Sequence, residues 1–230
     1  MKEMLTNNVL FGIVLTFVSL EIGRYLFKKT KLTIVNPFLI ACTVSILFLK
    51  VFNIPYSSYM LGGSILNVFL GAANVVLGIL LFKQIEYLKR HFKAVMIGAL
   101  AGCITSAICI TVLCKLFGVH VSLLLSLLPK SITTPIAVEV VHMIGGIDTI
   151  TVVAISVTGV TGAVVATHVL RIARINHPIA KGVAIGSASH VIGTSKAIEI
   201  GELEGAMSAT SIVVCGVITL VLVPLLAKFL

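Results

Sequence analysis

The chain has 230 residues, of which 58% are hydrophobic and 11% are charged, and its net charge is +9. A soluble domain carries about 25% charged residues, so this composition excludes an ordinary soluble protein and predicts a protein embedded in a lipid bilayer. The positive charge would suit nucleic acid, but the basic residues cluster between apolar runs, where they set orientation in a membrane, so we expect no nucleic-acid partner.

Six apolar runs are each long enough to cross about 30 Å of hydrocarbon as a helix. In chain order they cover residues 7–27, 32–51, 61–82, 94–117, 147–170 and 206–229. The first run lacks the features of a cleaved signal peptide, so we expect a retained helix. Asn36 and Pro37 predict a simple helix start before the second run. We expect a single membrane domain over 1–230, with scaffold helices in 1–93 and a core in 94–230.

Basic clusters follow the first, third and fifth runs. Their residues are Lys28, Lys29 and Lys31, then Lys83, Lys89, Arg90 and Lys93, then Arg171, Arg174 and Lys181. Because positive charge marks cytoplasmic loops, we expect these three loops in the cytoplasm and the N-terminus on the other side of the membrane.

Two polar segments interrupt the core, at 122–146 and 182–205. Under this orientation each segment begins and ends on one face, and about 25 residues are too few to cross twice as helices. The sequence therefore predicts an all-α membrane protein with two re-entrant hairpins that enter from opposite faces and meet near the midplane, as in carriers with inverted repeats. The alternative is that each segment crosses once as a broken helix, which places Arg171, Arg174 and Lys181 outside.

Polar residues gather at the tip of the first segment. We expect Thr134 to cap a half-helix whose first residue is Pro135, so that its free N–H groups and positive end face Lys130, Ser131 and Thr133. A cation with N–H and O–H donors forms an anion site, which makes these four polar residues candidates for substrate binding. In the alternative, the hydroxyls only satisfy freed backbone groups and Lys130 reaches an interface.

Glu139 and His142 lie three residues apart on this half-helix and share a face, so they are candidates for proton coupling. The alternative is a structural pair, or a His142 that only reaches the outer aqueous surface. Asp148 begins the fifth run and is expected to cap its helix.

The second segment supplies further candidates for substrate binding, which are Ser187, Ser189, His190, Thr194 and Lys196. His190 lies at the expected tip between small residues and is a candidate for both substrate binding and proton coupling, although a hydrogen-bonded core histidine is the alternative. Glu199 follows Lys196 by three residues and is expected to neutralise it, with proton coupling as a further role. The expected breaks of the two segments are Pro129, Pro135, Gly145, Gly146, Gly186 and Gly193.

No pattern points to catalysis, a cofactor or a metal. The chain has no G-x-S-x-G elbow, phosphate-binding loop or H-E-x-x-H sequence, and its five cysteines lie within or at the ends of apolar runs without C-x-x-C spacing. We expect no enzyme and interpret the cysteines as small packing residues.

Two stretches carry a resemblance to a known family. LLPKSITTPIAVEVVHMIGGIDTITV and IAKGVAIGSASHVIGTSKAIEIGELEGAMSA are similar to the signature stretches of the bacterial LrgB/CidB family, which is related to the plastid glycolate/glycerate translocator. The likeness covers the whole chain. Glu139, His142 and the GIDT that follows resemble the CidB branch more than the LrgB branch.

This resemblance implies two functions. One is transport of a small monocarboxylate such as pyruvate, glycolate, glycerate or acetate. The other is a holin-like or antiholin-like role in which the protein regulates murein hydrolase export and cell lysis. Both imply a small LrgA/CidA-type membrane subunit as partner. Because two polar tips at the midplane suit a carrier better than a nonselective hole, we expect proton-coupled carboxylate transport by a homodimer or higher assembly.

Overall fold

A computed structural model gives the structure of residues 6–30, 37–83 and 85–230. Lys31 and Asn36, which carried part of the orientation and helix-start predictions, lie outside these residues. The described chain is helical and divides into two compact units, Met1–Ala73 and Asn74–Leu230, which we describe separately. The expectation of a single membrane domain stays a prediction.

The first unit contains helices α2 (Val9–Thr30), α3 (Pro37–Val51) and the start of α4 (Tyr56–Lys83). Gly12 of α2 contacts the backbone of Tyr59 and Gly62, so a larger side chain would not fit there. Close approach through small residues is the usual way in which helices pack inside membranes. A hydrogen bond between the hydroxyls of Thr16 and Tyr59, at 2.9 Å, also joins α2 to α4.

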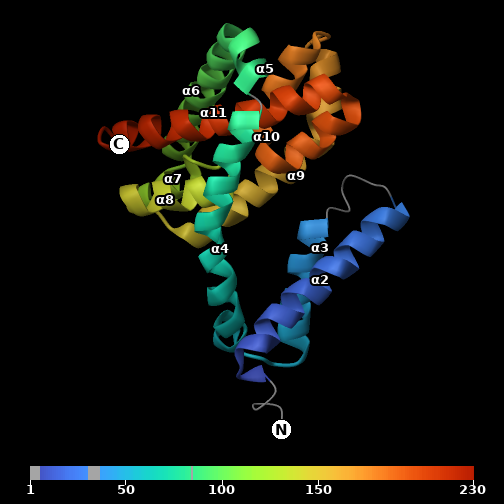
Figure 1. Ribbon diagram of the computed structural model, residues 1–230. Helices are drawn as coiled ribbons and strands as arrows, with labels where there is room; N and C mark the ends of the chain where they lie inside the picture. Colours follow the sequence, from blue (N-terminus) through green and yellow to red (C-terminus); the bar gives the residue numbers. More distant parts are fainter. Residues whose placement is uncertain (1–5, 31–36, 84) are drawn as a thin grey trace. The chain divides into compact units, whose positions relative to one another are not determined.

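The second unit holds the remaining helices (Figure 1). They are α5 (Ile85–Arg90), α6 (Phe92–Leu116), α7 (Val121–Leu127), α8 (Thr134–Ile144), α9 (Asp148–Ile172), α10 (Pro178–Ile200) and α11 (Glu202–Ala227). Among the described residues, α2, α6, α9 and α11 are long and apolar enough to cross a membrane, while α3 is a shorter apolar helix. The chain is thus an all-α membrane protein, as predicted.

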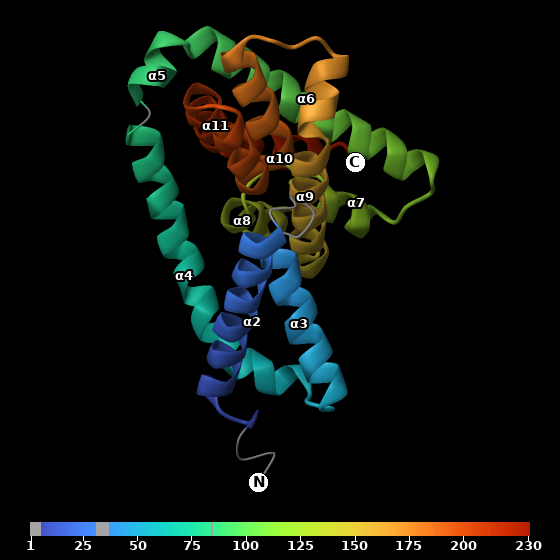
Figure 2. The same ribbon diagram turned by 90° about the vertical axis from the view of Figure 1, so that its right-hand side faces the viewer.

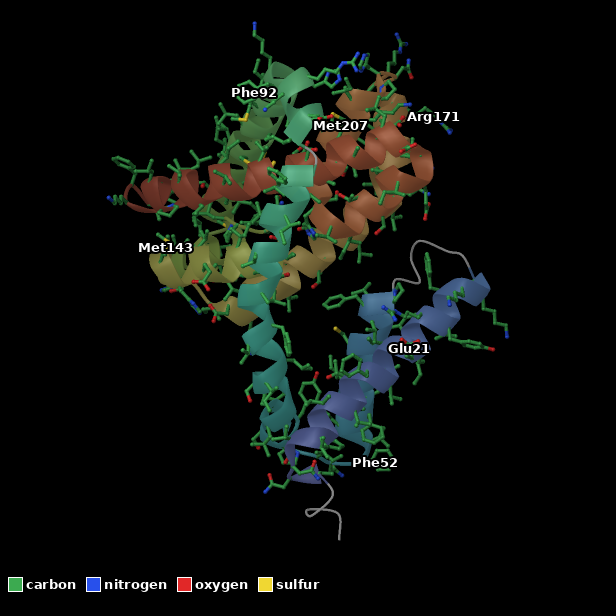
Figure 3. All side chains as sticks on the ribbon, viewed as in Figure 1. Glu21, Phe52, Phe92, Met143, Arg171 and Met207 are labelled. Atoms are coloured by element: carbon green, nitrogen blue, oxygen red, sulfur yellow. The ribbon has the colours of Figure 1, made fainter. Side chains whose placement is uncertain are left out.

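Helices α6 and α10 begin at the same end of the second unit. Gly98 of α6 packs against Val183 of α10, and Gly102 packs against Ser187 one turn later on both helices. The two helices therefore run in the same direction over this contact. Figure 3 labels Phe92 at the start of α6 and Arg171 near the end of α9, both near the same edge of the unit, away from Met143. We call these two regions the Arg171 end and the Met143 end.

Helix α9 runs in the opposite direction to the first part of α10. Gly159 faces His190, whereas the later Gly162 faces the earlier Ser189. Since the first part of α10 runs in the same direction as α6, helix α9 runs opposite to α6, from the Met143 end to the Arg171 end.

Helix α11 runs parallel to α6. The thiol of Cys215 donates to the carbonyl oxygen of Ala99 at 4.0 Å, and one turn later Thr219 donates to the sulfur of Cys103 at 3.6 Å. These contacts occur in the same order along both helices, so α11 also starts at the Arg171 end. Cys103 and Cys215 thus pack between α6 and α11, as predicted, and Cys114 is buried, whereas Cys109 is exposed.

The second predicted hairpin is α10 itself. Its backbone leaves the helical region only at His190, where φ is 42° and ψ is −138°, and Figure 2 gives a second view of this helix. Lys181 in its first arm and Ile200 at its last residue line one cavity of about 380 Å³ beside Arg174, so both arms end at the Arg171 end. The break lies between Gly186 and Gly193, and the expectation that these glycines are themselves the breaks is wrong, because both are helical.

The first predicted hairpin consists of α7, a turn over residues 128–133, and α8. Ile132 in the turn shares a buried cluster with Ile155 in the middle part of α9, whereas Ile144 at the end of α8 packs near Val223 and Leu226 late in α11. Figure 1 likewise shows α8 near the C-terminal part of α11. The hairpin thus enters from the Met143 end, opposite to α10, and the single-crossing alternative is wrong.

The expected breaks of the first hairpin fall at its corners. Pro129 lies in the turn, and Pro135 is the second residue of α8. Gly145 ends α8 with φ of 76°, a left-handed conformation that favours glycine, and Gly146 packs against the backbone of Ser126. Ser126 then ties α7 to α9, because its hydroxyl accepts from the backbone N–H of Ile147 at 2.7 Å.

Replacement of Gly186 tests the packing of the second hairpin. Any Cβ at Gly186 collides with the backbone of Ser208 in α11, so we expect Gly186→Val to lower the free energy of unfolding by about 1–3 kcal/mol. Ala188→Val, at an exposed position of the same arm, is the matched control. The measurement is the thermal midpoint of detergent-purified protein, followed by size-exclusion chromatography. Equal midpoints for Gly186→Val and the wild type would contradict this packing.

Candidate functional site

The two hairpin tips approach the same part of α9. The ring nitrogen Nε2 of His190 bonds to the carbonyl oxygen of Ile155 at 3.0 Å, while Lys130 lines a cavity with Ala154 and Thr158 from the adjacent turns. Lys130 and His190 thus lie beside neighbouring turns of α9. The structure therefore brings together the candidate residues of both segments that lie at the tips.

Lys130 is held by hydroxyl groups. Its Nζ donates to the hydroxyl oxygen of Ser131 at 3.0 Å, and that hydroxyl bonds to Ser106 of α6 at 3.1 Å. The ion pairs among the described residues do not include this partly buried lysine. A desolvated cation without a counter-ion is costly, so the surroundings of Lys130 favour an anion.

The start of α8 supplies further donors. Its N-cap is Thr133 and its first residue is Thr134, so the prediction of Thr134 as the cap is wrong by one residue. The hydroxyl of Thr133 is buried and makes no hydrogen bond with its own helix or with any other described residue. The first N–H groups of a helix also lack partners within that helix. A ligand that accepts hydrogen bonds would satisfy both kinds of group.

His190 forms the tip of the second hairpin in a strained conformation. Its φ of 42° lies in a region that residues with a side chain rarely adopt. Three contacts hold it: Thr194 donates to the His190 carbonyl oxygen at 2.9 Å, Ile155 bonds the ring, and Gly159 leaves room for the ring on α9. Such strain persists only where neighbours enforce it, and it concentrates at functional sites.

The remaining hydroxyls of the second hairpin lie close to this tip. Thr194 bonds to Ser208 of α11 at 2.7 Å, Ser189 packs against Gly162 of α9, and Ser187 donates to the Ala184 carbonyl oxygen at 3.2 Å. All three candidates, Ser187, Ser189 and Thr194, are buried. They lie on three sides of the turn, against α6, α9 and α11.

Two predicted charged residues of the second segment lie away from the tip. Lys196 and Glu199 form an ion pair at 2.7 Å on the second arm of α10, as the sequence predicted, and both side chains are at least partly exposed. Their roles in substrate binding and proton coupling stay predictions.

The charged residues of α8 lie beyond the first turn of that helix. Glu139 and His142 are exposed, and His142 pairs with Asp148 at 2.7 Å. Because Ile147 is the N-cap of α9 and Asp148 its first residue, the prediction that Asp148 caps this helix is wrong. The proton-coupling roles of Glu139 and His142 stay predictions.

Sequence reasoning missed Ser106 and Ser208. Each is a serine within an apolar run, and each bonds a residue of a hairpin. The clue in the sequence was a polar group placed in hydrocarbon, which is costly. That clue did not single out these two residues, because many other serines in apolar runs bond only to their own helix.

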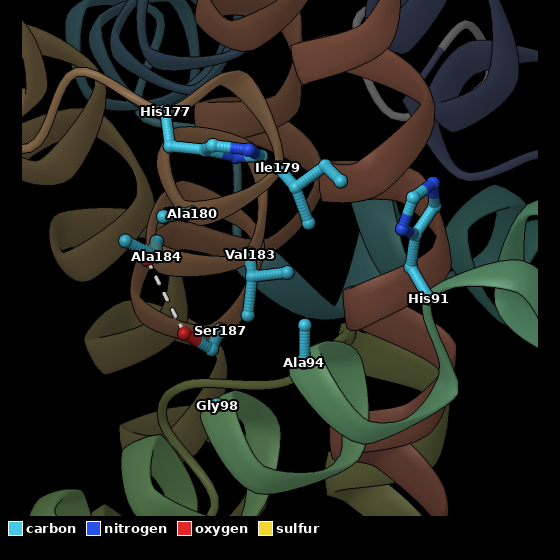
Figure 4. A pocket seen from close by; sticks show the side chains of 9 residues that line it. All are labelled: His91, Ala94, Gly98, His177, Ile179, Ala180, Val183, Ala184 and Ser187. Atoms are coloured by element: carbon cyan, nitrogen blue, oxygen red, sulfur yellow. Dashed lines mark hydrogen bonds between the residues drawn. The ribbon is translucent and has the colours of Figure 1, made fainter.

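A cavity of about 720 Å³ lies between the first turns of α6 and the first arm of α10 (Figure 4). We call it the α6–α10 cavity. Its wall includes His91, Ala94 and Gly98 from the α6 side and His177, Val183 and Ser187 from the α10 side. The two histidines are the N-caps of their helices. Sequence reasoning gave neither histidine a role, because the pairing of α6 with α10 is a tertiary contact.

A second cavity of about 460 Å³ runs along the first half of α9, and we call it the α9 cavity. Its wall is mainly apolar and includes Val153, Val157 and Thr158 of α9. Lys130 and Leu127 of the first hairpin complete the wall, so this cavity leads to the partly buried cation.

Comparison with known proteins identifies the family. The sequence profile of the LrgB-like family matches residues 16–229. The chain belongs to the LrgB-like family. Two of its relatives in that family, from Bacillus cereus strain B4264 and Bacillus anthracis strain A0248, are both named antiholin-like protein LrgB. Each is 35% identical over 221 residues, which cover 96% of this chain and 96% of the relative. No solved structure matches the chain.

The LrgB-like match covers both hairpins and most of the first unit. It confirms the family that the two signature stretches predicted. The LrgB-like relatives carry the LrgB name, and the sorting of this chain to the CidB branch stays a prediction.

Two replacements of His190 test its strained conformation. Both His190→Gly and His190→Ala remove the bond to Ile155, but only glycine adopts the positive φ without steric cost. We therefore expect the glycine variant to be more stable than the alanine variant by about 1 kcal/mol, measured from thermal midpoints in detergent. The order should reverse at the helical, exposed Ala188, where Ala188→Gly is destabilising by a similar amount. An alanine variant at 190 as stable as the glycine variant would contradict the strain.

Proposed function

We propose that this membrane protein carries small monocarboxylates, of the pyruvate, glycolate, glycerate or acetate type, across the inner membrane of a bacterium. The observation that supports this most directly is the meeting of two oppositely inserted hairpin tips beside α9, with Lys130 lacking a carboxylate partner among the described residues. Broken segments that meet in the interior are typical of carrier binding sites.

The donors at the first tip favour a carboxylate. Lys130 supplies a cation, Thr133 a hydroxyl without a partner among the described residues, and α8 the free N–H groups of its first turn. All of these donate hydrogen bonds, and a carboxylate only accepts them. The apolar surroundings, which include Ile132 and Ile155, limit the rest of the substrate to a small group with few polar atoms.

His190 is the residue that we propose for proton coupling. The Ile155 carbonyl oxygen can only accept a hydrogen bond, so Nε2 of His190 carries a proton in this contact. The other nitrogen of the neutral ring, Nδ1, remains able to accept a proton. Protonation and the approach of an anion to Lys130 would then occur at neighbouring side chains.

The cellular setting belongs to the same proposal. The basic loops at the Arg171 end favour a cytoplasmic position for that end and an N-terminus outside. We further propose a homodimer or higher assembly and a small LrgA/CidA-type membrane subunit as partner.

A second candidate function is an antiholin-like role in the control of cell lysis. The names of the relatives favour this role more directly than they favour transport. The two functions are compatible if the movement of a carboxylate and a proton changes the energetic state of the membrane on which a holin acts.

Uptake of labelled pyruvate, glycolate and acetate into proteoliposomes with an imposed pH gradient tests the carrier. We expect saturable uptake by the wild type and at least about a tenfold loss in Lys130→Ala and His190→Ala, because each replacement removes a polar group from the tips. Lys115→Ala, at the exposed end of α6, is the matched control and should retain uptake. Size-exclusion chromatography checks that each variant is folded.

The same proteoliposomes separate the two candidate functions. Absence of uptake, with or without the small subunit, would contradict transport. Release of unrelated dyes under those conditions would favour a hole, and restraint of dye release by a co-reconstituted holin would favour the antiholin-like role.

A further inference from the structure

The two cavities approach the hairpin tips from opposite ends of the second unit. The α6–α10 cavity lies between the first residues of α6 and α10, which are at the Arg171 end. The α9 cavity runs along residues 149–158 at the start of α9, which is at the Met143 end. A substrate in the α6–α10 cavity would therefore lie toward the Arg171 end, and a substrate in the α9 cavity would lie toward the Met143 end.

The inner limits of the two cavities are close together. Ser187 is the lining residue furthest along α10, and it faces Gly102 of α6. One helical turn further, about 6 Å along the axis, Ser106 bonds to Ser131. Ser131 in turn accepts a hydrogen bond from Lys130, which lines the α9 cavity. The hydroxyls of Ser106 and Ser131 and the ammonium of Lys130 are thus hydrogen-bonded in a row that begins about one helical turn beyond the contact of Ser187 with Gly102.

We propose that the α6–α10 cavity and the α9 cavity are the two aqueous half-pathways of the carrier, separated by the Ser106, Ser131 and Lys130 contacts. This inference rests on the proposed function and adds the route by which a short monocarboxylate reaches the tips from each side. In this proposal, displacement of a hairpin tip opens one half-pathway and closes the other.

The chemistry of the cavities matches this occupant. Their volumes of about 720 and 460 Å³ fall within the range of about 300–1,000 Å³ that is usual for small-molecule sites. Both walls are mainly apolar, which suits a short hydrocarbon tail, and each has a polar group at its inner limit, Ser187 in one and Lys130 in the other. The starts of α6 and α10 also present their positive dipole ends to the wider cavity, which favours an anion.

Gly102 determines whether the first half-pathway stays open at its inner limit. A Cβ at this position would lie 3.1 Å from both Cβ and Oγ of Ser187, which is tighter than ordinary contact. The absence of a side chain at Gly102 therefore leaves the hydroxyl of Ser187 accessible from the cavity. A branched side chain there would fill the space between α6 and α10.

Thiol labelling tests the two half-pathways without relying on transport. Single cysteines, Ala184→Cys in the α6–α10 cavity and Ala154→Cys in the α9 cavity, are placed in a chain whose five native cysteines are replaced by alanine. A negatively charged, membrane-impermeant methanethiosulfonate is then applied to right-side-out and inside-out vesicles. We expect each cysteine to react from one face only, the two faces to be opposite, and pyruvate to slow both reactions.

Reaction of both cysteines from the same face would overturn the proposal. So would the absence of reaction at Ala154→Cys, because a lipid-filled groove excludes this reagent. Saturable uptake together with either result would leave the carrier function intact and reject only the half-pathways. Labelling from opposite faces without uptake or protection by pyruvate would support water-filled half-pathways and reject the monocarboxylate as their occupant.

A replacement in α6 provides the second measurement. Gly102→Val should reduce pyruvate uptake by about tenfold or more, because its methyl groups occupy the space beside Ser187. Labelling of Ala184→Cys should persist, since the outer part of the cavity is unchanged. Ala101→Val, at an exposed neighbouring position of α6, is the matched control and should transport normally. Normal uptake by folded Gly102→Val would overturn the route past Ser187.

Discussion

A helix that breaks inside a membrane exposes backbone groups that water cannot reach, and the second unit is built around satisfying them. At the break in α10, Thr194 donates to the carbonyl oxygen of His190, and the imidazole of His190 bonds the carbonyl oxygen of Ile155 in α9. At the base of the first hairpin, Ser126 accepts from the backbone of Ile147. The buried hydroxyl of Thr133 is the exception in this pattern, and it lies at the tip where a ligand would bind. Most polar side chains of the core therefore serve to hydrogen-bond backbone groups, and the polar groups that do not serve in this way define the candidate site.

Glycines, which have no side chain, allow the helices around these hairpins to pack closely. Gly186 places the first arm of α10 directly against the backbone of Ser208 in α11, and Gly162 leaves room on α9 for Ser189. Because lipid tails are as apolar as leucine, burial of hydrocarbon contributes little to helix association in a bilayer, and packing and hydrogen bonds carry more of it. The hydroxyl bond between Thr194 and Ser208 depends on that close approach.

The sequence was sufficient for the class, the long helices and the opposite insertion of the hairpins, because each follows from hydrophobic length and from the positions of basic residues. It also located the second tip near His190, since polar groups beside glycines are costly in hydrocarbon. It did not place the break at His190 itself, because a residue with a side chain at positive φ is held there by tertiary contacts with Thr194 and Ile155. The pairing of His142 with Asp148, and the cavity between α6 and α10, depend likewise on which helices become neighbours.

The hydroxyl environment of Lys130 has an electrical consequence for the proposed carrier. With no carboxylate paired to it among the described residues, Lys130 gives the unloaded tip one positive charge. A bound monocarboxylate cancels this charge, and the proton that we propose for His190 restores it. One elementary charge that moves through a potential of 100 mV changes in energy by about 2.3 kcal/mol. The membrane voltage would therefore act alike on the loaded and the empty tip, and one complete cycle of the proposed carrier would move no net charge across the membrane.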